Sequence, residues 1–386
     1  MGQTKVLGGL IEGAGTAWQE GLKTTNFTAI AGEGYFVNTT STEITVTLPA
    51  GVVGTEIVIQ DYAGTFATNK VIFASNGSEK IQGSTDDYKC IINNATVTLI
   101  YQDATKGWNA DNIETNAASS VPLTVHYLVV AGGGSGGSNS NSGGGGAGGY
   151  RTNYGGTALS LNVATNYNVT VGGGAAATTS SPWNGTVGSN SDFNNISATG
   201  GGGGSGQGGS SSSGGSGGGG AYDTNGNSGN AGGYSPVEGY AGGNGQASGS
   251  HPGGGGGGAS ESGNTDGAGY GGDGASNSIT GSAVVYAGGG SGGVSAGYSI
   301  IPGGDGGGGA GSNNSALGTS GTPNTGGGAG GGSGGYGGGA GGSGIVILRY
   351  PSGYTISGLS GHHTTTTVGT DKVTSFTSGT GTISFS

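Results

Sequence analysis

The chain carries little charge of either sign, and positive charge is the scarcer of the two. Charged residues make up 8 % of its 386 residues, and 9 lysines and arginines stand against 20 aspartates and glutamates. Proteins that bind nucleic acids need lysine and arginine side chains to neutralise phosphates. No basic face can be assembled from so few bases, so the composition argues against nucleic acid as a partner.

Cysteine is nearly absent, because Cys90 is the only one in the chain. No intramolecular disulfide can form, and a small scaffold stapled by disulfides is excluded. The four histidines are scattered, and no group of residues has the spacing of a catalytic set or a metal site. We therefore expect no catalytic residue, no metal and no cofactor, and a protein that is not an enzyme.

Long hydrophobic runs are also missing. No stretch approaches the roughly 20 apolar residues that cross a bilayer, so we expect the chain not to be membrane-embedded. Residues 1–11 show neither the apolar run nor the cleavage pattern of a secretory signal, so we expect no signal peptide. A neutral, polar chain without disulfides or an export signal fits a particle that is assembled inside a cell and released by lysis.

Glycine is in large excess, with 83 of the 103 glycines between Gly132 and Gly344. Composition alone would suggest a flexible linker. Glycine has no Cβ, however, so extended polyproline II-type helices of about three residues per turn can approach to backbone hydrogen-bonding distance. Such a helix bonds none of its own N–H and C=O groups, so its neighbours must supply the partners. With only 8 prolines and no Gly-X-Y period, collagen is excluded, and we expect packed polyglycine II helices.

The composition predicts a mainly β chain in five parts. These are an extended N-terminal attachment arm (1–23), a β module (24–110), a linker (111–125), a glycine-rich polyglycine II domain (126–350) and a C-terminal β tail (351–386). In the module, apolar and polar residues alternate or cluster in short runs at 42–49, 56–60, 70–73 and 95–101, with turn residues between them. Short strands at this spacing predict a small antiparallel β-sandwich or barrel.

In the glycine-rich region, short β-type runs lead directly into glycines, at 126–134, 167–174, 193–201 and 283–290. These runs predict a β floor from which the polyglycine II layer continues. We expect 127–130 to pair with 345–350, which would close the domain. In the tail, residues 372–386 alternate with period two and predict a hairpin. This tail resembles the segment that stands before the glycine-rich domain in related phage fibre proteins, and the resemblance implies that it returns to pair with the floor.

Two groups of motifs resemble known proteins. The segments 26–37, 47–51, 61–66 and 97–101, followed by Gly107-Trp108, are similar to a β module of tail-fibre-like proteins of marine tailed phages, over 24–110. Tyr-Leu-Val-Val-Ala-Gly-Gly-Gly at 127–134, and further landmarks at 148–151, 167–174 and 343–351, resemble the glycine-rich domain of phage tail-fibre proteins. More distantly, the region is similar to the polyglycine II adhesins of T-even fibre tips, which recognise bacterial surface receptors.

The resemblance implies a structural and adhesive protein of a virion, with a host cell-surface receptor as its partner. Loops rich in Tyr, Asn, Ser and Thr separate the glycine blocks, a composition that suits adaptable binding surfaces. The receptor-binding candidates in these loops are Trp183, Tyr222, Tyr234, Tyr240 and Tyr298. The alternative is that these aromatic side chains cover the flanks of the glycine lattice or pack between subunits.

Residues 1–23 and the function of the whole chain each have alternative interpretations. Residues 1–23 either lie on a domain of the chain or dock onto other tail-fibre or baseplate proteins, and we expect a homo-oligomer. Instead of a tail fibre, the chain could form an extracellular filament linked head to tail through its N-terminal arm and C-terminal hairpin. An ice-binding polyglycine protein is a third possibility, which the irregular loops do not favour.

Overall fold

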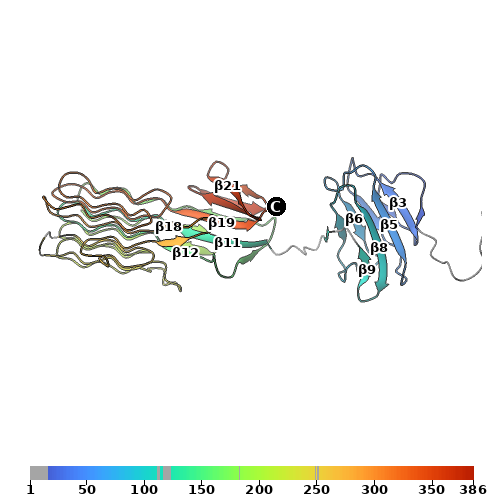
Figure 1. Cartoon of the computed structure of the whole chain (residues 1–386), viewed down its shortest axis with the longest axis horizontal. Coiled ribbons are helices and arrows are strands. Elements are labelled where there is room, and N and C mark those ends of the chain that lie inside the picture. The colour runs from blue at the N-terminus through green and yellow to red at the C-terminus, as the bar shows by residue number, and fades with distance from the viewer. Residues whose placement is uncertain (1–15, 111–113, 116–122, 182, 248, 250–251) are drawn as a thin grey trace, which may run out of the picture. The chain divides into compact units, whose positions relative to one another are not determined.

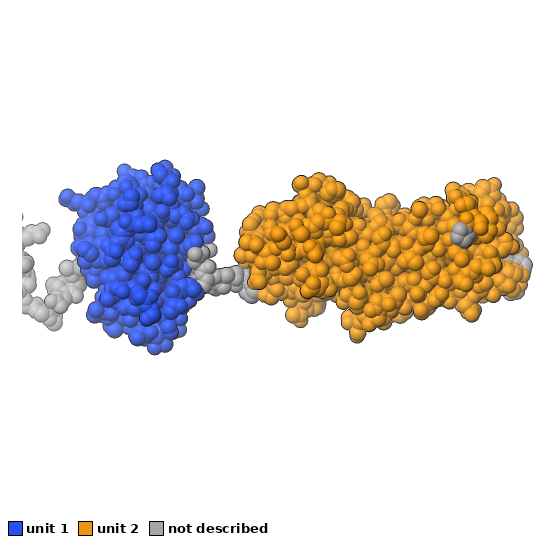
Figure 2. Space-filling model, turned by 180° about the vertical axis from the view of Figure 1, so that it is seen from behind, with its two compact units in different colours: residues 1–122 blue, residues 123–386 orange. Residues whose placement is uncertain are grey.

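The structure is a computed structural model that describes residues 16–110, 114–115, 123–181, 183–247, 249 and 252–386. The chain forms two compact units, residues 1–122 and 123–386 (Figure 2). All the regular secondary structure of the described residues is β-strand, and none of it is helix. The predicted mainly β fold with a glycine-rich domain is therefore confirmed.

Unit 1 is a sandwich of two open five-stranded sheets (Figure 1). The first contains, in spatial order, β1 (Ala17–Trp18), β3 (Glu33–Val37), β5 (Glu56–Asp61), β8 (Thr96–Asp103) and β9 (Gly107–Ala110). The second contains β10 (Glu114–Thr115), β7 (Tyr88–Cys90), β6 (Val71–Ala74), β4 (Ile44–Thr47) and β2 (Phe27–Thr28). The strands predicted at 42–49, 56–60, 70–73 and 95–101 correspond to β4, β5, β6 and β8.

The strand directions differ from the antiparallel arrangement that the sequence suggested. β1, β3 and β5 are parallel neighbours, and so are β2, β4 and β6; only the later pairs are antiparallel. The chain alternates between the two sheets from β1 to β6, so strands adjacent in sequence face each other across the core. Strands two apart therefore run in the same direction within one sheet. A period of two locates a strand, but it does not identify the strand's partner.

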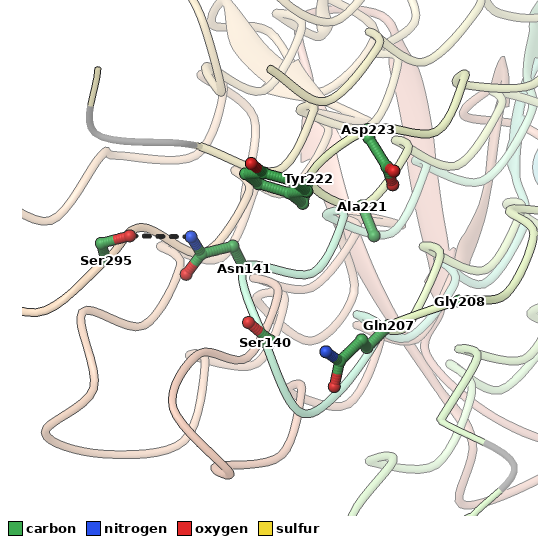
Figure 3. A pocket seen from close by; sticks show the side chains of 8 residues that line it. All are labelled: Ser140, Asn141, Gln207, Gly208, Ala221, Tyr222, Asp223 and Ser295. Carbon is green, nitrogen blue, oxygen red and sulfur yellow. Dashed lines mark hydrogen bonds between the residues drawn. The ribbon is translucent and has the colours of Figure 1, made fainter. Parts of the chain in front are cut away.

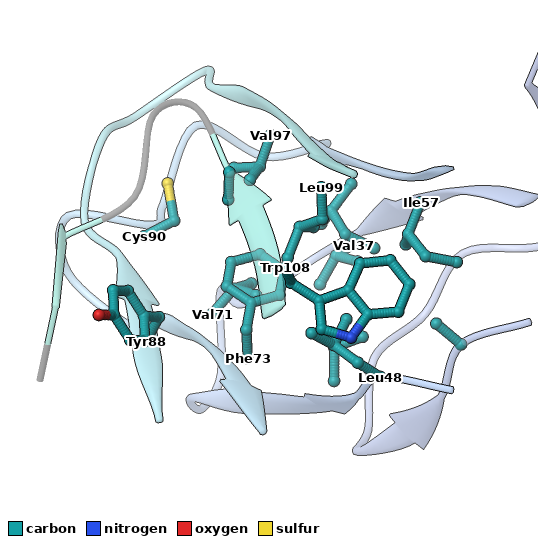
Figure 4. Close-up of a cluster of buried hydrophobic side chains, with 14 of the residues drawn as sticks. Val37, Leu48, Ile57, Val71, Phe73, Tyr88, Cys90, Val97, Leu99 and Trp108 are labelled. Carbon is teal, nitrogen blue, oxygen red and sulfur yellow. The ribbon is translucent and has the colours of Figure 1, made fainter. Parts of the chain in front are cut away.

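The core of unit 1 lies between its two sheets and is centred on Trp108 of β9 (Figure 4). Trp108 is fully buried, and the ring of Tyr101 meets its indole edge-on at 5.5 Å between centroids. Leu48 and Ile57 belong to the same cluster. The alternating apolar residues of both sheets supply this core, as the period-two pattern requires.

Part of the predicted N-terminal arm packs on unit 1. β1 pairs with β3, and Trp18 stacks on Phe36 with 4.7 Å between ring centroids. The backbone of Lys23 forms an isolated parallel β-bridge with that of Val37. Residues 16–23 therefore extend the first sheet, whereas residues 1–15 of the predicted arm lie outside the described residues.

Unit 2 begins as a second β-sandwich. One sheet has the order β12 (Tyr150–Thr152), β11 (Leu123–Val130), β19 (Ile345–Pro351), β22 (Asp371–Phe376) and β21 (His363–Val368), and β13 (Leu159–Leu161) also pairs with β11. The other has the order β16 (Ile196–Ala198), β15 (Ser191–Phe193), β14 (Tyr167–Thr170), β23 (Thr380–Phe385) and β20 (Ile356–Gly358). β17 (Ala275–Asn277) and β18 (Val284–Tyr286) form a separate hairpin.

The predicted pairing of 127–130 with 345–350 is confirmed, because β11 and β19 are antiparallel neighbours with Val129 opposite Val346. The tail also returns to this sheet, through β22 beside β19. The predicted hairpin within 372–386 is wrong: β22 pairs with β21, whereas β23 crosses to the other sheet and lies between β14 and β20. Phe376 and Phe385 both point into the core between the sheets, so their shared apolar pattern did not distinguish the two arrangements.

β11 is buried on both faces, which explains its almost continuous apolar sequence. Tyr127 and Val129 belong to the core between the two sheets. Leu128 and Val130 belong to a second cluster, with Ile279 and other residues from the glycine-rich part of the chain. This sheet therefore joins the tail sandwich on one side to the glycine-rich part on the other.

Glycine runs continue from these strands, as the sequence predicts. The first glycine comes two residues after the last residue of β11, β14, β16 and β18. The runs extend side by side, away from β11 and β19, and end in loops (Figure 1). We call this array the lattice, its end at β11 and β19 the sheet end, and its opposite end the distal end.

Residues 143–149 show how the lattice is held together. Their N–H groups donate to three neighbouring runs in rotation, and each neighbour is met again three residues later. The pairs are Gly143 with Ser205, Gly146 with Gly202 and Gly149 with Thr199; Gly144 with Gly254 and Ala147 with Gly257; Gly145 with Ala329 and Gly148 with Gly326. This rotation is the signature of packed polyglycine II helices, which have about three residues per turn and no internal hydrogen bonds.

The carbonyl groups of the same run accept from three further neighbours, so the run has six in all. Donors come from 131–137, 216–219 and 290–293; examples are Gly134 to Gly146, Gly219 to Gly144 and Gly290 to Gly145. A Cβ on Gly145 would lie 2.2 Å from the carbonyl oxygen of Gly134. The backbone is thus the core of the lattice, and an interior run has no space for side chains on its glycines.

Candidate functional site

Several loops meet at the distal end of the lattice, and we call seven of them the distal loops. They are residues 138–142, 179–184, 207–210, 221–225, 294–302, 312–317 and 333–336, of which residue 182 is not described. Asp223 is their only charged residue. Loops carried on a rigid scaffold are where proteins commonly place binding residues.

Asn141 joins four of the distal loops through hydrogen bonds. Its amide nitrogen donates to Ser295 Oγ over 2.8 Å, and its amide oxygen accepts from Ser333 Oγ over 2.8 Å. Its backbone carbonyl accepts from the N–H of Tyr222 over 3.0 Å. Asn141 is buried and has a φ of 38°, a conformation that asparagine tolerates better than most residues. The relative positions of these loops are therefore fixed by one side chain and its backbone.

An open pocket of about 480 Å³ lies between these loops (Figure 3). Tyr222, Asp223 and Gln207 line it, together with Ser140, Asn141, Gly208, Ala221 and Ser295. The Gln207 amide, the Asp223 carboxylate and the Ser140 hydroxyl form no hydrogen bond with another described residue. The pocket therefore offers one carboxylate, one amide and one hydroxyl beside an aromatic ring, and none of its described lining residues is positively charged.

The structure brings three of the five predicted receptor-binding residues to the distal end. Tyr222 is 39 % exposed beside the pocket, and Tyr298 is 48 % exposed in the loop that contains Ser295. Trp183 is half-buried, and its carbonyl oxygen accepts a hydrogen bond from the N–H of Ser138 over 2.8 Å. These three residues lie in distal loops tied to the 138–142 turn.

The other two candidates lie towards the sheet end. Tyr234 follows Asn230 and packs beside Arg151 of β12, with the guanidinium carbon 3.9 Å from the ring centroid. Tyr240 lies in a lattice run, with its N–H bonded to Gly258 and its carbonyl to Gly217. The five aromatic residues thus occupy two separate regions of unit 2 rather than one surface.

The sequence reading did not single out Asn141, Gln207 or Ser295. A signal was present for Asn141, since the segment 138–142 reads Ser-Asn-Ser-Asn-Ser between two glycine blocks. Of the twelve described non-glycine residues with positive φ, eight are asparagines, so asparagine is the main turn residue of this chain besides glycine. Asparagines between glycine blocks therefore mark the points where the lattice reverses direction.

Three acidic residues also come together on the lattice. Single carboxylate oxygens of Glu261, Asp266 and Asp273 lie within 4.8 Å of one another. Two of them already have backbone partners: Glu261 accepts from the N–H of Asp273 over 3.1 Å, and Asp273 accepts from the N–H of Asp305 over 2.7 Å. These contacts give the acids a part in holding adjacent turns together.

Among the described residues, no helix has the length and hydropathy needed to span a bilayer.

Comparison with known proteins identifies the family of this chain. No curated protein sequence matches the chain. Residues 110–351 match a family described as a glycine-rich domain, and this match covers more than half of the sequence and the whole lattice. The chain belongs to the glycine-rich domain family.

Proposed function

We propose that this chain is a non-enzymatic structural and adhesion protein of a phage tail fibre, whose distal loops contact the host surface. The observation that carries the proposal is the distal end of the lattice, where exposed Tyr222 and Tyr298 stand on loops fixed by Asn141. The resemblance of the separated landmarks in 126–351 to phage tail-fibre proteins supports it. The released virion would be the site of action.

The rigidity of the lattice supports an adhesive role. The interior run 143–149 bonds through its N–H and C=O groups to six neighbouring runs, which leaves it little freedom. The loops that such runs carry are therefore held in defined positions before any partner arrives. Binding by preorganised loops loses less conformational entropy than binding by flexible ones. Tyrosine, serine and asparagine provide contact area and adaptable hydrogen bonds.

The other end of the chain would attach to the virion. In this proposal residues 1–23 contact other tail-fibre or baseplate proteins, and copies of the chain associate as a homo-oligomer. Residues 16–23 support an attachment through unit 1, because β1 carries Trp18, which is 44 % exposed while stacked on Phe36. An exposed aromatic pair on a sheet is suited to contact with a further protein.

A cell-binding assay with the full chain tests the proposal. Labelled protein is incubated with a panel of bacteria, and the double variant Tyr222→Ala/Tyr298→Ala is compared with Tyr62→Ala/Tyr240→Ala. Both variants remove two exposed tyrosines, but only the first removes them from the distal loops. We expect the first to lose binding and the second to retain it. Equal loss in both variants, or no binding to any plausible host, would contradict the adhesive role.

A second function is favoured by a different observation. β21 is an edge strand with four consecutive threonines, Thr364 to Thr367, which are all exposed and uncharged. Unpaired edges without charge or proline readily add another strand. A filament that joins copies through this edge is therefore the alternative, and electron microscopy separates the two: indefinite polymers indicate a filament, and discrete particles indicate a fibre component.

A further inference from the structure

Arg151 is the only lysine or arginine between residues 131 and 344, and it lines a second pocket of unit 2. This pocket, of about 300 Å³, lies at the sheet end of the lattice, at the opposite end from the distal loops. Its wall includes Tyr127, Tyr150 and Thr152, together with Ser235, Pro236, Val237, Ala259 and Ala275. One strong base in a wall whose other residues are all uncharged requires an explanation.

The guanidinium of Arg151 is held in a fixed orientation. Its carbon atom lies 3.9 Å from the centroid of the Tyr234 ring, and its Nη1 donates to the carbonyl of Ser197 over 2.9 Å. Stacking on an aromatic ring leaves the edge of the guanidinium plane available for further hydrogen bonds. The one hydrogen bond shown engages a single N–H of the five, so most of the donor capacity remains.

Hydrogen bonds between side chains and the backbone hold the loop that presents Tyr234. The side chain of Asn230 accepts from the N–H of Tyr234 over 3.1 Å and donates to its carbonyl over 3.0 Å. Glu238, which is completely buried, accepts from the N–H of Thr199 over 2.8 Å and from the N–H of Gly232 over 3.2 Å. Both ends of the loop are fixed, and the ring is thereby held against Arg151.

No carboxylate of the described residues forms an ion pair with Arg151. Glu238 is the acidic residue of the adjoining loop, but its oxygens are turned to the backbone of Thr199 and Gly232. Partly buried arginines are usually paired, and the planar fork of a guanidinium matches a carboxylate in two parallel hydrogen bonds. The missing member of the site is therefore an anion from outside.

We propose that this pocket binds a carboxylate group of a ligand, with Arg151 as the anchor and Tyr127 and Tyr150 as side walls. The pocket is at the small end of the range for ligand sites, about 300–1,000 Å³, so it takes one residue-sized unit. Two sources supply this chemistry, an acidic sugar and the C-terminal carboxylate of a peptide. The site is independent of the distal loops, and it does not rest on their proposed role.

Isothermal titration calorimetry with the full chain tests the site with two pairs of probes. Glucuronate is compared with glucose, and N-acetylalanine is compared with its amide, so that each pair differs only in the carboxylate. We expect one of the carboxylates to bind and its neutral counterpart not to bind. The pair that responds identifies the source. Binding of neither carboxylate, or equal binding of a carboxylate and its neutral counterpart, overturns the proposal.

Variants separate the anchor from general effects on folding. Arg151→Gln should weaken carboxylate binding by about tenfold or more, because a charged hydrogen-bonding partner is lost. Arg151→Lys keeps the positive charge but not the planar guanidinium. Its affinity for the carboxylate should lie between that of the parent and that of Arg151→Gln. Tyr62→Ala, which removes an exposed tyrosine of unit 1, is the control and should bind as the parent does. Unchanged affinity in Arg151→Gln, with thermal melting like that of the parent, would show that Arg151 is not the anchor.

Discussion

The amide oxygen of Asn141 accepts a hydrogen bond from Ser333 Oγ over 2.8 Å, although 192 residues separate the two in sequence. The contact closes the distal end of the lattice, since Asn141 comes from the first reversal of the chain and Ser333 from the last one. Ser333 Oγ is also 2.7 Å from the carbonyl of Val294, which brings a third loop into the same cluster.

Replacement of Asn141 by alanine should loosen several loops at once. The variant loses two side-chain hydrogen bonds and places alanine at a φ of 38°, so we expect a loss of about 2–4 kcal/mol in the free energy of unfolding of unit 2. Hydrogen exchange should quicken in 221–225, 294–302 and 333–336. Ser140→Ala, in the same turn, is the control. Exchange that quickens only in 138–142 would show that Asn141 does not couple the loops.

Two glycine-to-alanine substitutions should differ sharply in their effect on the free energy of unfolding. A Cβ at Gly145 would lie 2.2 Å from a backbone oxygen, whereas a Cβ at Gly173 would meet nothing within 4 Å. Backbone in the lattice interior cannot move aside, so Gly145→Ala should cost more than about 4 kcal/mol or prevent folding. Gly173→Ala should be neutral or stabilising by up to about 1 kcal/mol, because alanine restricts the unfolded chain.

Thermal and denaturant unfolding of both glycine variants, followed by circular dichroism, measure this difference. Equal effects of the two substitutions would mean that the interior of the lattice is looser than its hydrogen bonds indicate.

Asp61 should be essential to unit 1. Its buried carboxylate accepts five backbone N–H groups, from Ala63, Gly64, Thr65, Phe66 and Asn94, at 2.9 to 3.3 Å. In Asp61→Asn one acceptor oxygen becomes a donor that faces these N–H groups, and we expect a loss of about 2–4 kcal/mol.

Glu43→Gln is the matched control for Asp61→Asn, since both remove one negative charge from unit 1. Glu43 pairs with Lys70 at 3.8 Å on the exposed surface, and such a pair contributes about 0–1 kcal/mol. Urea unfolding followed by tryptophan fluorescence compares the two. A loss of the same size in both variants would attribute the effect to net charge instead of the buried hydrogen bonds.

Tyr35 should make unit 1 sensitive to alkaline pH. Burial, together with the hydrogen bond that its hydroxyl donates to Glu33, raises the pKa of Tyr35 to about 12. An unfolded tyrosine has a pKa of about 10. Because the folded pKa is the higher one, this contribution to stability is complete below pH ~10 and is lost as the pH rises from about 10 to about 12.

The variant Tyr35→Phe isolates this effect. It should be less stable than the parent at pH 7, since the N–H of Ile30 also loses the Tyr35 hydroxyl as its acceptor, at 2.9 Å. Between about pH 10 and pH 12 its stability should fall less steeply than that of the parent. Parallel curves of unfolding free energy against pH would contradict the assignment. Tyr88, whose pKa burial also raises, is present in both proteins and cancels in the comparison.

The positions of the strands were largely predictable, but their partners were not. Val46 alternates with polar neighbours and Ile59 ends a short apolar run, and these patterns identify β4 and β5. Nothing in either strand shows that they belong to opposite sheets. The same holds for Phe376 and Phe385, which face one core from two different sheets. Local periodicity reports which face of a strand is buried, whereas the choice of neighbour depends on the whole fold.

The lattice was predictable in kind for a simple physical reason: only glycine permits backbones to pack this closely. Its internal order was not, because a run of glycines has the same surface in every direction and no side chain marks its neighbours. Outer runs do carry a signal that was overlooked. Gly172, Ala175 and Thr178 are buried whereas Ala176 is exposed, so inward-facing positions recur every third residue.

The distal site was only half predictable. Tyr222 and Tyr298 stood out as aromatic residues in polar loops, and so did Tyr234, which lies at the other end. The chain changes direction at the turn after each run. The end of the lattice at which a loop lies therefore depends on how many turns precede it. That number cannot be read from glycine blocks of variable length.

The three-residue rotation of hydrogen bonds sets a rule for how such a domain changes in length. Inserting one or two residues within the run 143–149 would turn every later N–H towards the wrong neighbour, whereas three residues would restore the phase. Between runs, a loop can grow or shrink by any number of residues without disturbing that phase. Length variation in a lattice of this kind is therefore stepwise inside and continuous at its two ends, where new surfaces can arise without any change to the interior.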